Sequence, residues 1–272
     1  MQSIPAVFGP WLRRWNLTPD GEAIFTPFLS HLLPVRQGET AAILKIAQNQ
    51  EEREGAHLMV WYAGDGAARV LQHQDSALLL ERAMGTRSLR LMAQSGKDAA
   101  ACAVICASVA RLHEPRTGPL PPMLAPLPVW FRQLAPAAVR HGGVLVKSAE
   151  AASALLLAPQ DPVVLHGDIH HDNILDGEAR GWIAIDPKGL FGERAYDYAN
   201  TFCNPDFATA TTPGTLARRM AVISAAAKLD PQRLLQWVLA YAGLSAAWSL
   251  DEGADPTLGL AVARIAATEL GL

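Results

Sequence analysis

The segment from Val163 to Pro187, VVLHGDIHHDNILDGEARGWIAIDP, constrains the fold more than any other part of the chain. Two short runs of strand-forming residues, NIL and WIAID, flank the turn-rich sequence DGEARG, so we expect them to pair as an antiparallel hairpin. Asn173 begins the outgoing strand and Asp186 ends the returning one, which places their side chains at the same end, within about 5 Å if directly opposed. Asp168 lies in the loop that enters this end. The segment therefore predicts that one amide and two carboxylates converge at one open edge.

These three side chains suit magnesium-dependent phosphoryl transfer. The amide of Asn173 and the carboxylate of Asp186 offer the hard oxygen ligands that Mg²⁺ prefers when it is bound to phosphate. The further carboxylate, Asp168, can orient an attacking hydroxyl or accept its proton as the catalytic base. The order of base, metal ligand five residues later, hairpin and second metal ligand is the protein-kinase layout H-R-D-x-x-x-x-N followed by D-F-G. We therefore expect an α+β, bilobal, protein-kinase-like fold that uses ATP and Mg²⁺.

The histidines of the same segment allow a different interpretation, a zinc site built from His166, His170 and His171. Histidines beside acids in a loop usually serve hydrogen bonding, so the magnesium interpretation is favoured. A dinuclear metallophosphatase also uses Gly-Asp and Asn-His elements. It needs an Asp-x-His on an earlier strand, and no such sequence precedes this segment.

The rest of the chain divides into a strand-rich and a helix-rich part. Two extended stretches flank the turn RQGET, a short amphipathic helix follows at 49–64, and two further strands are expected at 67–73 and 76–85. We predict a small N-terminal β-sheet lobe that binds nucleotide over residues 1–82, and a larger, mainly helical lobe for catalysis and substrate binding over residues 83–272. Helical patterns in the second lobe cover 96–113, 131–158, 215–229, 231–249 and 256–270.

One lysine in the first lobe matches the needs of a nucleotide site. Lys45 is the only charge of the apolar strand AAILKIA, where a kinase needs a lysine for the phosphates of ATP. A lysine that tends to be buried needs a carboxylate partner, and the helix just downstream offers three, Glu51, Glu52 and Glu54. The crossover to the second lobe, from Glu81 to Ala83, is expected to present backbone groups to the adenine.

Composition excludes several classes of partner. The net charge is −3, and no block of Lys and Arg stands out, which argues against nucleic acid. No apolar run approaches the roughly 18 residues of a membrane span, and the N-terminus lacks the apolar core of a signal peptide. Three cysteines favour a reducing compartment, so we expect a cytoplasmic protein without a membrane partner. Cys102 and Cys106, in an apolar helical pattern, indicate buried thiols rather than a metal or redox pair.

The run LHGDIHHDNIL…WIAIDPKGLFGERAYDYAN resembles the aminoglycoside phosphotransferases, and most of all their streptomycin 6-phosphotransferase branch, the aminoglycoside/hydroxyurea antibiotic resistance kinases. The similarity includes ILKIA, LLLERAMG and YAGLSAAWSLDEG, and covers most of residues 25–255. The HGD–N–ID core alone specifies only a superfamily that includes choline-, homoserine- and fructosamine-type kinases. The resemblance implies that Asp168 is the catalytic base, that Asn173 and Asp186 hold Mg²⁺, and that Lys45 contacts the α- and β-phosphates of ATP.

The resemblance also bears on the partner of Lys45. Its position relative to the pair Gly55-Ala56 implies Glu52, with Glu54 as the alternative. The chain departs from kinases in two respects. It lacks a Gly-x-Gly-x-x-Gly over the phosphates, whose work falls to the turn TPFLSH at 26–31, and it lacks an arginine beside Asp168, which places it with the small-molecule kinases.

The implied reaction is transfer of the γ-phosphoryl group of ATP to a hydroxyl of an aminoglycoside, most specifically streptomycin. Its two guanidinium groups need acidic or carbonyl-rich walls, for which the candidates are Glu193, Asp206, Asp251 and Glu252. Asp197, within YDYAN, is expected to support the catalytic loop instead. Two alternatives stay open, a kinase of another small alcohol, sugar or amino alcohol, and a non-catalytic kinase-like binding module. The intact set of Lys45, Asp168, Asn173 and Asp186 argues against the second.

Overall fold

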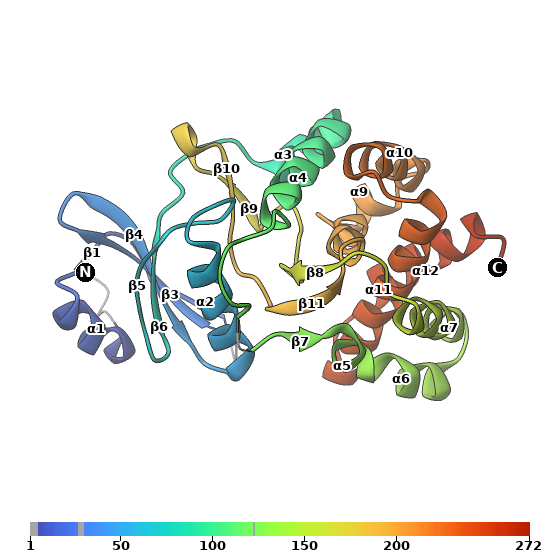
Figure 1. Cartoon of the computed structure of the whole chain (residues 1–272), viewed down its shortest axis with the longest axis horizontal. Helices are drawn as coiled ribbons and strands as arrows, with labels where there is room; N and C mark the ends of the chain where they lie inside the picture. The colour runs from blue at the N-terminus through green and yellow to red at the C-terminus, as the bar shows by residue number, and fades with distance from the viewer. Residues whose placement is uncertain (1–4, 27–29, 122) are drawn as a thin grey trace.

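A computed structural model describes residues 5–26, 30–121 and 123–272, and it separates a sheet-rich N-terminal part from a helical remainder (Figure 1). The elements of the first part are η1 (Ala6–Phe8), α1 (Gly9–Arg14), β1 (Thr18–Pro19), β2 (Ile24–Thr26), β3 (Ser30–Gln37), β4 (Thr40–Ala47), α2 (Gln50–Tyr62), β5 (Val70–Gln74) and β6 (Ala77–Glu81). The next elements are α3 (Leu89–Met92), η2 (Ala93–Lys97), α4 (Asp98–Leu112), β7 (Ala125–Pro126), α5 (Leu127–Trp130), η3 (Phe131–Gln133), α6 (Leu134–His141), α7 (Val144–Leu157), β8 (Pro162–Leu165), β9 (Ile174–Asp176), η4 (Glu178–Arg180) and β10 (Trp182–Ala184). The last are β11 (Leu190–Glu193), α8 (Tyr196–Ala199), η5 (Asn200–Cys203), α9 (Phe207–Thr211), α10 (Thr215–Ala227), α11 (Pro231–Glu252) and α12 (Thr257–Glu269).

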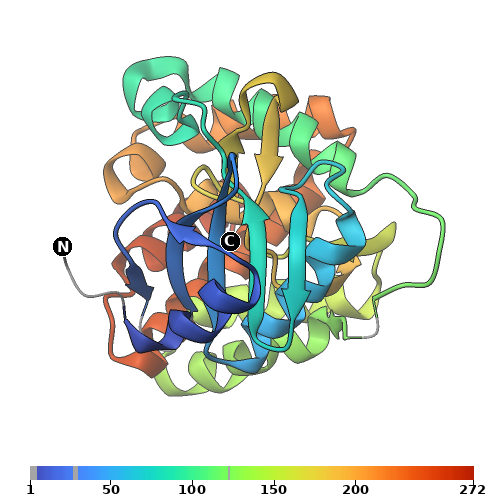
Figure 2. The same ribbon diagram turned by 90° about the vertical axis from the view of Figure 1, so that its left-hand side faces the viewer.

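The N-terminal strands form one antiparallel sheet, which faces the viewer in Figure 2. Its order is β1–β3–β4–β6–β5, with β2 paired to β3. The turn predicted from RQGET joins β3 and β4, where Gln37 pairs with Thr40. The strands expected at 67–73 and 76–85 are present as β5 and β6, although β6 ends at Glu81. The sheet expected in the first lobe is therefore confirmed.

The alternation of side chains in β4 explains how this sheet has one core face and one cleft face. Successive residues of a strand point to opposite sides, and Ala42, Leu44 and Ile46 are buried in the core beneath α1. The residues between them, Ile43 and Lys45, line a cavity on the other side of the sheet. The strand therefore delivers its one lysine into the cleft and not to solvent.

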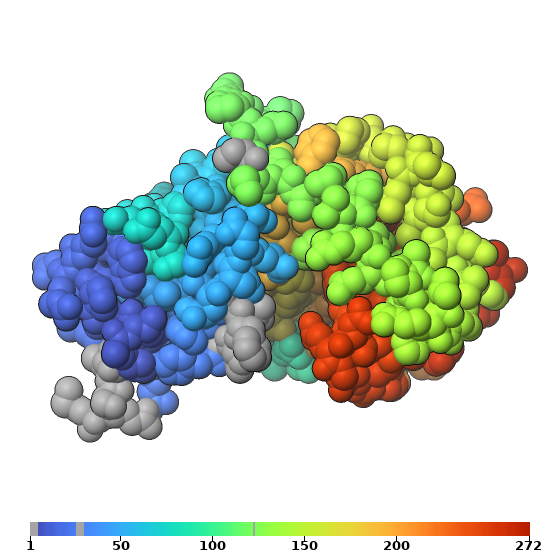
Figure 3. Space-filling model, turned by 90° about the horizontal axis from the view of Figure 1, so that it is seen from below, coloured from blue at the N-terminus to red at the C-terminus, as the bar shows by residue number. Residues whose placement is uncertain are grey.

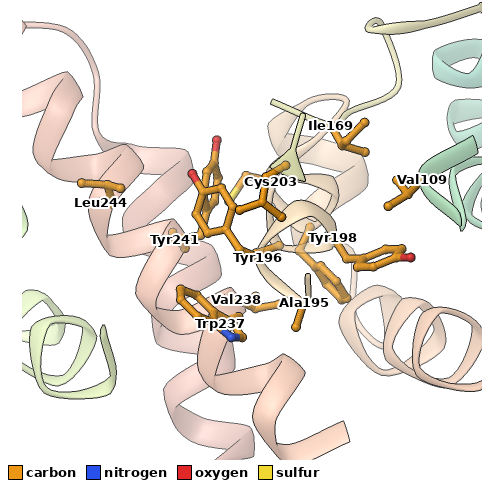
Figure 4. Packing of buried hydrophobic residues seen from close by; sticks show 14 of the residues in the cluster. Val109, Ile169, Ala195, Tyr196, Tyr198, Cys203, Trp237, Val238, Tyr241 and Leu244 are labelled. Atoms are coloured by element: carbon orange, nitrogen blue, oxygen red, sulfur yellow. The ribbon is translucent and has the colours of Figure 1, made fainter. Parts of the chain in front are cut away.

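Helix α11 lies at the centre of the helical part. It packs against α7, α12 and α8 (Figure 1). Its aromatic residues Trp237 and Tyr241 contact Tyr196 of α8 edge-on, with ring centroids 5.7 and 5.9 Å apart (Figure 4). Such edge-to-face pairs add to the energy of burial alone. These aromatic residues belong to the same buried cluster as Ile169, which lies in the segment that follows β8.

The hairpin predicted between Asn173 and Asp186 is present. Strands β9 and β10 pair in antiparallel register, and the backbone N–H of Ile185 donates to the carbonyl oxygen of Asn173 at 2.9 Å. The hairpin also bonds to the loop between α2 and β5. The N–H of Ala184 donates to the carbonyl oxygen of Gly66, and its carbonyl oxygen accepts from the N–H of Ala68, each at 2.9 Å. The N-terminal part and the hairpin are thereby joined by backbone hydrogen bonds.

Several helix limits differ from the expectation. Helix α4 begins at Asp98, after a π-helical turn at 93–97, and Gly142-Gly143 divide the pattern at 131–158 into α6 and α7. Asp230 caps α11, with its carboxylate accepting from the N–H of Arg233 at 2.7 Å. At α12 the cap residue is Pro256, and the carboxylate of Asp255 accepts from the N–H of Thr257 at 2.9 Å.

The structure also bears on the expectations for the cysteines and for membrane spans. Cys102 and Cys106 are buried free thiols, as expected, and burial raises the pKa of each to about 12. Among the helices of residues 5–26, 30–121 and 123–272, none is long and apolar enough to cross a membrane.

Candidate active site

The loop that carries Asp168 is held from below by Asp197. The carboxylate of Asp197 is buried and accepts from the N–H groups of His166 and Gly167 at 2.9 and 2.7 Å, and it also contacts His113 Nε2 at 2.8 Å. The role expected for Asp197, support of the loop, is confirmed by these bonds. Gly167 has φ +88°, and a Cβ there would lie 2.9 Å from the side chain of Leu190, so the turn requires glycine.

His166 links this loop to the hairpin. Burial lowers its pKa, so the ring is neutral. Its Nδ1 accepts from the N–H of Asp168 at 3.2 Å, which assigns the proton to Nε2, the donor to the carbonyl of Ile185 at 2.9 Å. Both ring nitrogens are therefore used in orienting the backbone. In the described ranges, no group of three or more His, Cys, Asp or Glu residues could hold a metal ion, and the zinc interpretation has no support.

Two amides fix the carboxylate of Asp168. Asn173 Nδ2 donates to Asp168 Oδ2 at 3.1 Å and to its carbonyl oxygen at 2.9 Å, and Asn200 Nδ2 donates to Oδ1 at 2.8 Å. The side chain of Asp168 is 27% exposed and lines an open cavity. Neutral donors on each oxygen hold the carboxylate in one orientation. Asn200 was not predicted as a site residue, and the one feature of the sequence that marks it is its place at the end of YDYAN.

Asn173 and Asp186 offer a donor set that fits Mg²⁺. Because Asn173 Nδ2 donates to Asp168, the hydrogen bonds identify which side-chain atom of Asn173 is the nitrogen and which is the oxygen. The oxygen, Asn173 Oδ1, is the atom that could bind a metal ion. Asn173 and Asp186 line the same cavity. One amide oxygen and one carboxylate, with phosphate oxygens and water to complete the shell, are the usual protein share of a magnesium site. The residues present therefore suit this ion.

A network of opposite charges surrounds Asp186. Lys45 Nζ contacts the carboxylates of Asp186 and of Glu52, the latter at 2.5 Å, which confirms Glu52 as the partner of Lys45. Glu54 instead accepts from Gln50 Nε2 at 3.1 Å. Burial raises the pKa of Asp186, but the ammonium groups of Lys45 and Lys188 outweigh it, so the net pKa is lowered. Asp186 is therefore ionised, as a metal ligand must be.

Lys188 is a second lysine in this network. It lies in the sequence IDPKG, from which no role was predicted for it. Its Nζ lies 3.2 Å from Glu52 Oε1, 3.4 Å from Glu51 Oε1 and 3.8 Å from Asp186 Oδ2. Burial alone would lower its pKa, and the surrounding carboxylates raise it above its ordinary value. Lys188 is thus a fixed positive charge beside the acidic groups.

The first cavity of the cleft is lined mainly by apolar residues, with a few polar groups among them. It has a volume of about 380 Å³ and lies between the sheet and the hairpin. Apolar residues from both sides line one end, and Lys45, Asn173 and Asp186 line it as well; the apolar members include Leu32, Ile43, Leu80, Leu175, Ile183 and Ile185. An apolar cavity with a few placed polar groups is typical of a site for a small molecule.

The crossover residues Glu81 and Ala83 line this first cavity. The carboxylate of Glu81 accepts from the N–H of Arg69 at 2.7 Å and pairs with Arg180. Its charge is therefore offset by the guanidinium group of Arg180, in η4 between the two strands of the hairpin. Of the turn at 26–31, residues 27–29 lie outside the described residues, whereas Ser30 lines the cavity.

A second cavity, of about 450 Å³, opens on the other side of Asp168. Its wall is assembled from three distant elements, with Glu51 from α2, Trp130 from α5, and Trp248 and Glu252 from α11. The two tryptophan rings meet edge-on, with centroids 5.3 Å apart. In Figure 3 the surface is hollowed between the N-terminal part and the helices of the C-terminal part. Carboxylates beside aromatic faces are suited to organic cations.

Of the four carboxylates expected to bind the acceptor, the structure brings Glu252 to this cavity. Glu193 is buried against Arg233 and Trp237, Asp206 caps α9 through the N–H of Thr209, and Asp251 pairs with Arg140 at 2.6 Å. These three carboxylates have partners elsewhere and do not line the cavity. Glu51, Trp130 and Trp248 also line this cavity, and they could not be predicted to do so because nothing in the local sequence relates them to one another.

Comparisons with known proteins agree with this geometry. The family model described as aminoglycoside/hydroxyurea antibiotic resistance kinase matches residues 14–253. The chain is 47% identical to a streptomycin 3''-kinase of Klebsiella pneumoniae over 247 residues, which is 89% of this chain and 92% of the relative. It is 31% identical to a streptomycin 6-kinase of Streptomyces griseus, over 92% of this chain and 84% of the relative.

A solved structure confirms the fold prediction. The chain superimposes on an aminoglycoside phosphotransferase in a ternary complex with ADP and hygromycin B, with a TM-score of 0.64 and 14% identity. The match covers 98% of this chain and 97% of the other. At this level of identity the likeness concerns the fold, and it establishes the bilobal, kinase-like α+β architecture expected from the order of residues around the hairpin.

Proposed function

The chain belongs to the aminoglycoside/hydroxyurea antibiotic resistance kinase family, and on that premise we propose that it transfers the γ-phosphoryl group of ATP to a hydroxyl of streptomycin. The observation that carries the proposal is the position of one segment between two cavities. Asp168 lines the larger cavity, and Asn173 and Asp186 line the smaller one. A nucleotide on one side and an acceptor on the other would meet at this segment.

The smaller cavity is the proposed ATP site. The adenine would lie among its apolar residues, against the backbone of Glu81 and Ala83, and Lys45, oriented by Glu52, would contact the phosphates. Asn173 and Asp186 would hold Mg²⁺, which would supply positive charge against the phosphates of ATP. We place the boundary between the two lobes at residue 82, next to this site.

Asp168 would act on the acceptor. Its carboxylate, held by the amides of Asn173 and Asn200, would accept the hydrogen bond of the substrate hydroxyl and then its proton. The hydroxyl oxygen forms a bond to the γ-phosphorus, and the bond from that phosphorus to the β,γ-bridging oxygen breaks, leaving its electron pair on ADP. Catalysis in this class is mostly positioning and charge neutralisation, and the fixed orientation of Asp168 supplies the first of these.

The larger cavity supports streptomycin as the acceptor. The antibiotic carries guanidinium groups, which stack on aromatic faces and pair with carboxylates. Trp130, Trp248, Glu51 and Glu252 line the cavity beside Asp168 and offer both kinds of contact. Hydroxyurea, which the family description also names, is small and uncharged, and it would leave these groups without partners.

The relatives bear on which hydroxyl is modified. Identity is 47% to the 3''-kinase and 31% to the 6-kinase. This difference favours the 3''-hydroxyl over the 6-hydroxyl that the sequence resemblance first suggested. The two products have the same mass, so the position must be read from NMR.

A screen of acceptors tests the proposal. Purified protein with ATP and Mg²⁺ is mixed with streptomycin, other aminoglycosides, hydroxyurea and small amino alcohols, and ADP release is followed for each. We expect streptomycin to give the highest kcat/KM and chelation of Mg²⁺ to abolish turnover. Faster turnover of a small alcohol would assign the chain to a different kinase, and a nucleotide-dependent rise in Tm without turnover on any acceptor would indicate a binding module.

A further inference from the structure

Lys188 occupies the border between the two cavities. Its side chain lines the larger cavity together with Gly167 and Asp168, and its Nζ reaches Glu52 Oε1 at 3.2 Å and Asp186 Oδ2 at 3.8 Å, both of which line the smaller one. Lys45, in contrast, lines the nucleotide cavity. The two ammonium groups therefore contact the same two carboxylates through different oxygens, Lys45 through Glu52 Oε2 and Asp186 Oδ1 and Lys188 through Glu52 Oε1 and Asp186 Oδ2.

The charge around this border requires a cation on the acceptor side. Asp168, Asp186, Glu51 and Glu52 lie around Lys188, and a triphosphate would add further negative charge to the same place. During transfer, the charge of the moving phosphoryl group is spread over its three equatorial oxygens. In the proposed reaction these oxygens would move toward the larger cavity, which Asp168 lines and Lys45 does not. A fixed cation on that side would lower the energy of the transition state.

Arg132 is another cation of the larger cavity, but its surroundings differ. It is exposed, and its guanidinium donates to the carbonyl of Val129, in the turn just before it. The side chain of Lys188 is 12% exposed, and it contacts residues of both cavities. Lys188 is therefore the better placed of the two for the transferring group.

We propose that Lys188 is a catalytic residue whose ammonium group binds the γ-phosphoryl oxygens as that group passes from ATP to the acceptor. The proposal rests on the proposed phosphotransferase function and adds a residue to it. Lys188 keeps its proton throughout, since the hydroxyl proton goes to Asp168 and the electron pair of the broken phosphorus–oxygen bond goes to ADP. Its contact with Glu52 and Asp186 holds the ammonium group in place before ATP binds, so little reorganisation is needed during the reaction.

A purely structural role for Lys188 leads to different consequences. As a mere bridge between α2 and the hairpin, it would affect the position of Glu52 and through it Lys45. Its loss would then weaken ATP binding and lower Tm. A charge that acts on the transferring group affects kcat and leaves ATP binding nearly unchanged.

The test compares Lys188→Met, which keeps the length of the side chain without its charge, with Lys188→Arg and with the control Lys97→Met. Lys97 is an exposed lysine at the end of η2. For each variant we would measure Tm, the Kd of ATP, kcat with streptomycin, and the slow hydrolysis of ATP by water. For Lys188→Met we expect a loss of about 10²- to 10³-fold in kcat and in hydrolysis, with the Kd of ATP changed by less than about threefold. Lys188→Arg should recover part of the loss, and Lys97→Met should match the wild type.

Chemical rescue adds a readout that a structural role would not move. Ethylammonium or propylammonium added to Lys188→Ala should restore part of kcat by placing a cation in the vacated volume. A kcat for Lys188→Met within about threefold of wild type, or a loss confined to the Kd of ATP and Tm, would overturn the proposal. Hydrolysis by water separates it from the acceptor assignment: wild type that hydrolyses ATP without phosphorylating streptomycin would refute the acceptor and still test Lys188. Wild type that consumes no ATP in either assay would overturn both.

Discussion

The two sides of the cleft are built in different ways. The catalytic segment, 163–187, is one continuous stretch whose polar groups bond to each other, as with Asp168, Asn173 and His166. The acceptor wall is assembled from α2, α5 and α11, which are far apart in the chain. The first arrangement holds a few atoms in fixed positions for chemistry. The second encloses a cavity, and the shape of that cavity depends on how whole helices pack against one another.

This difference suggests a division of labour that substitutions can test. A change in the catalytic segment should lower kcat for every acceptor and leave the affinity for streptomycin nearly intact. A change in the acceptor wall should raise KM for streptomycin and leave the nucleotide site alone. A substitution that produced the opposite pattern would show that the two sides are not separable.

Asp168 should give the largest effect. Asp168→Asn retains an amide that can hydrogen bond to Asn200 but cannot accept the hydroxyl proton, so kcat should fall by about 10³-fold. The Kd of ATP, measured by calorimetry, should stay close to wild type. The exposed Asp161, exchanged in Asp161→Asn, serves as the control with unchanged kcat. Retention of wild-type turnover in Asp168→Asn would remove this residue from the mechanism.

Gly55 should give the next largest effect, through the contact between α2 and the catalytic segment. A Cβ at Gly55 would lie 2.2 Å from the carbonyl oxygen of Pro187, so Gly55→Ala must displace either the helix or the segment. We expect the free energy of unfolding to fall by about 2 kcal/mol in denaturant titrations, together with a loss of kcat. In Gly9→Ala the new Cβ would meet Arg13 at an ordinary 3.6 Å, and the change should stay below about 1 kcal/mol. Equal stabilities of the two variants would contradict the close approach.

Trp248 tests the acceptor wall. Trp248→Ala removes an aromatic face that lines the cavity, and KM for streptomycin should rise about tenfold while KM for ATP stays constant. Trp248→Phe keeps an aromatic ring and should recover part of the affinity. Steady-state kinetics with each substrate varied in turn provides the comparison. A rise in KM for ATP instead would place Trp248 on the nucleotide side.

Glu252 and its neighbour Asp251 form a matched pair with the smallest expected effect. Glu252 lines the acceptor cavity, whereas Asp251 pairs with Arg140 and does not. Glu252→Gln should raise KM for streptomycin about fivefold, as expected for an exposed ionic contact worth about 1 kcal/mol. Asp251→Asn should leave KM unchanged. If Asp251→Asn raised KM as much as Glu252→Gln, the rise would reflect the net charge of this region and not a contact.

The same difference between the two sides explains what could be predicted from the sequence. The hairpin, and the convergence of Asp168, Asn173 and Asp186 near it, follow from local spacing and strand periodicity, because all three lie within one segment. Lys45 was recognised as the single charge of an apolar strand, and alternation along β4 does turn it toward the cleft. Such features depend on residues close in sequence.

The acceptor wall could not be predicted in this way. Glu51, Trp130 and Trp248 come together only because α2, α5 and α11 pack around the same cavity. From the sequence, Glu193 and Asp206 are both candidates for binding the substrate. In the structure, Glu193 pairs with Arg233, and Asp206 caps the start of α9. Whether a carboxylate is free depends on partners as far as 112 residues away along the chain, as with Asp206 and Gln94. The role proposed for Lys188 could not be predicted for a related reason. It depends on contacts of this lysine with residues of both cavities, which only the fold brings together.

Mass spectrometry of streptomycin tests the central claim most directly. The antibiotic is incubated with purified protein, ATP and Mg²⁺, and in parallel with Asp168→Asn. The account predicts that wild type adds the mass of one phosphoryl group to streptomycin and that the variant leaves it essentially unmodified in the same time. Unmodified streptomycin after incubation with wild type, or equal phosphorylation by the variant, would contradict it.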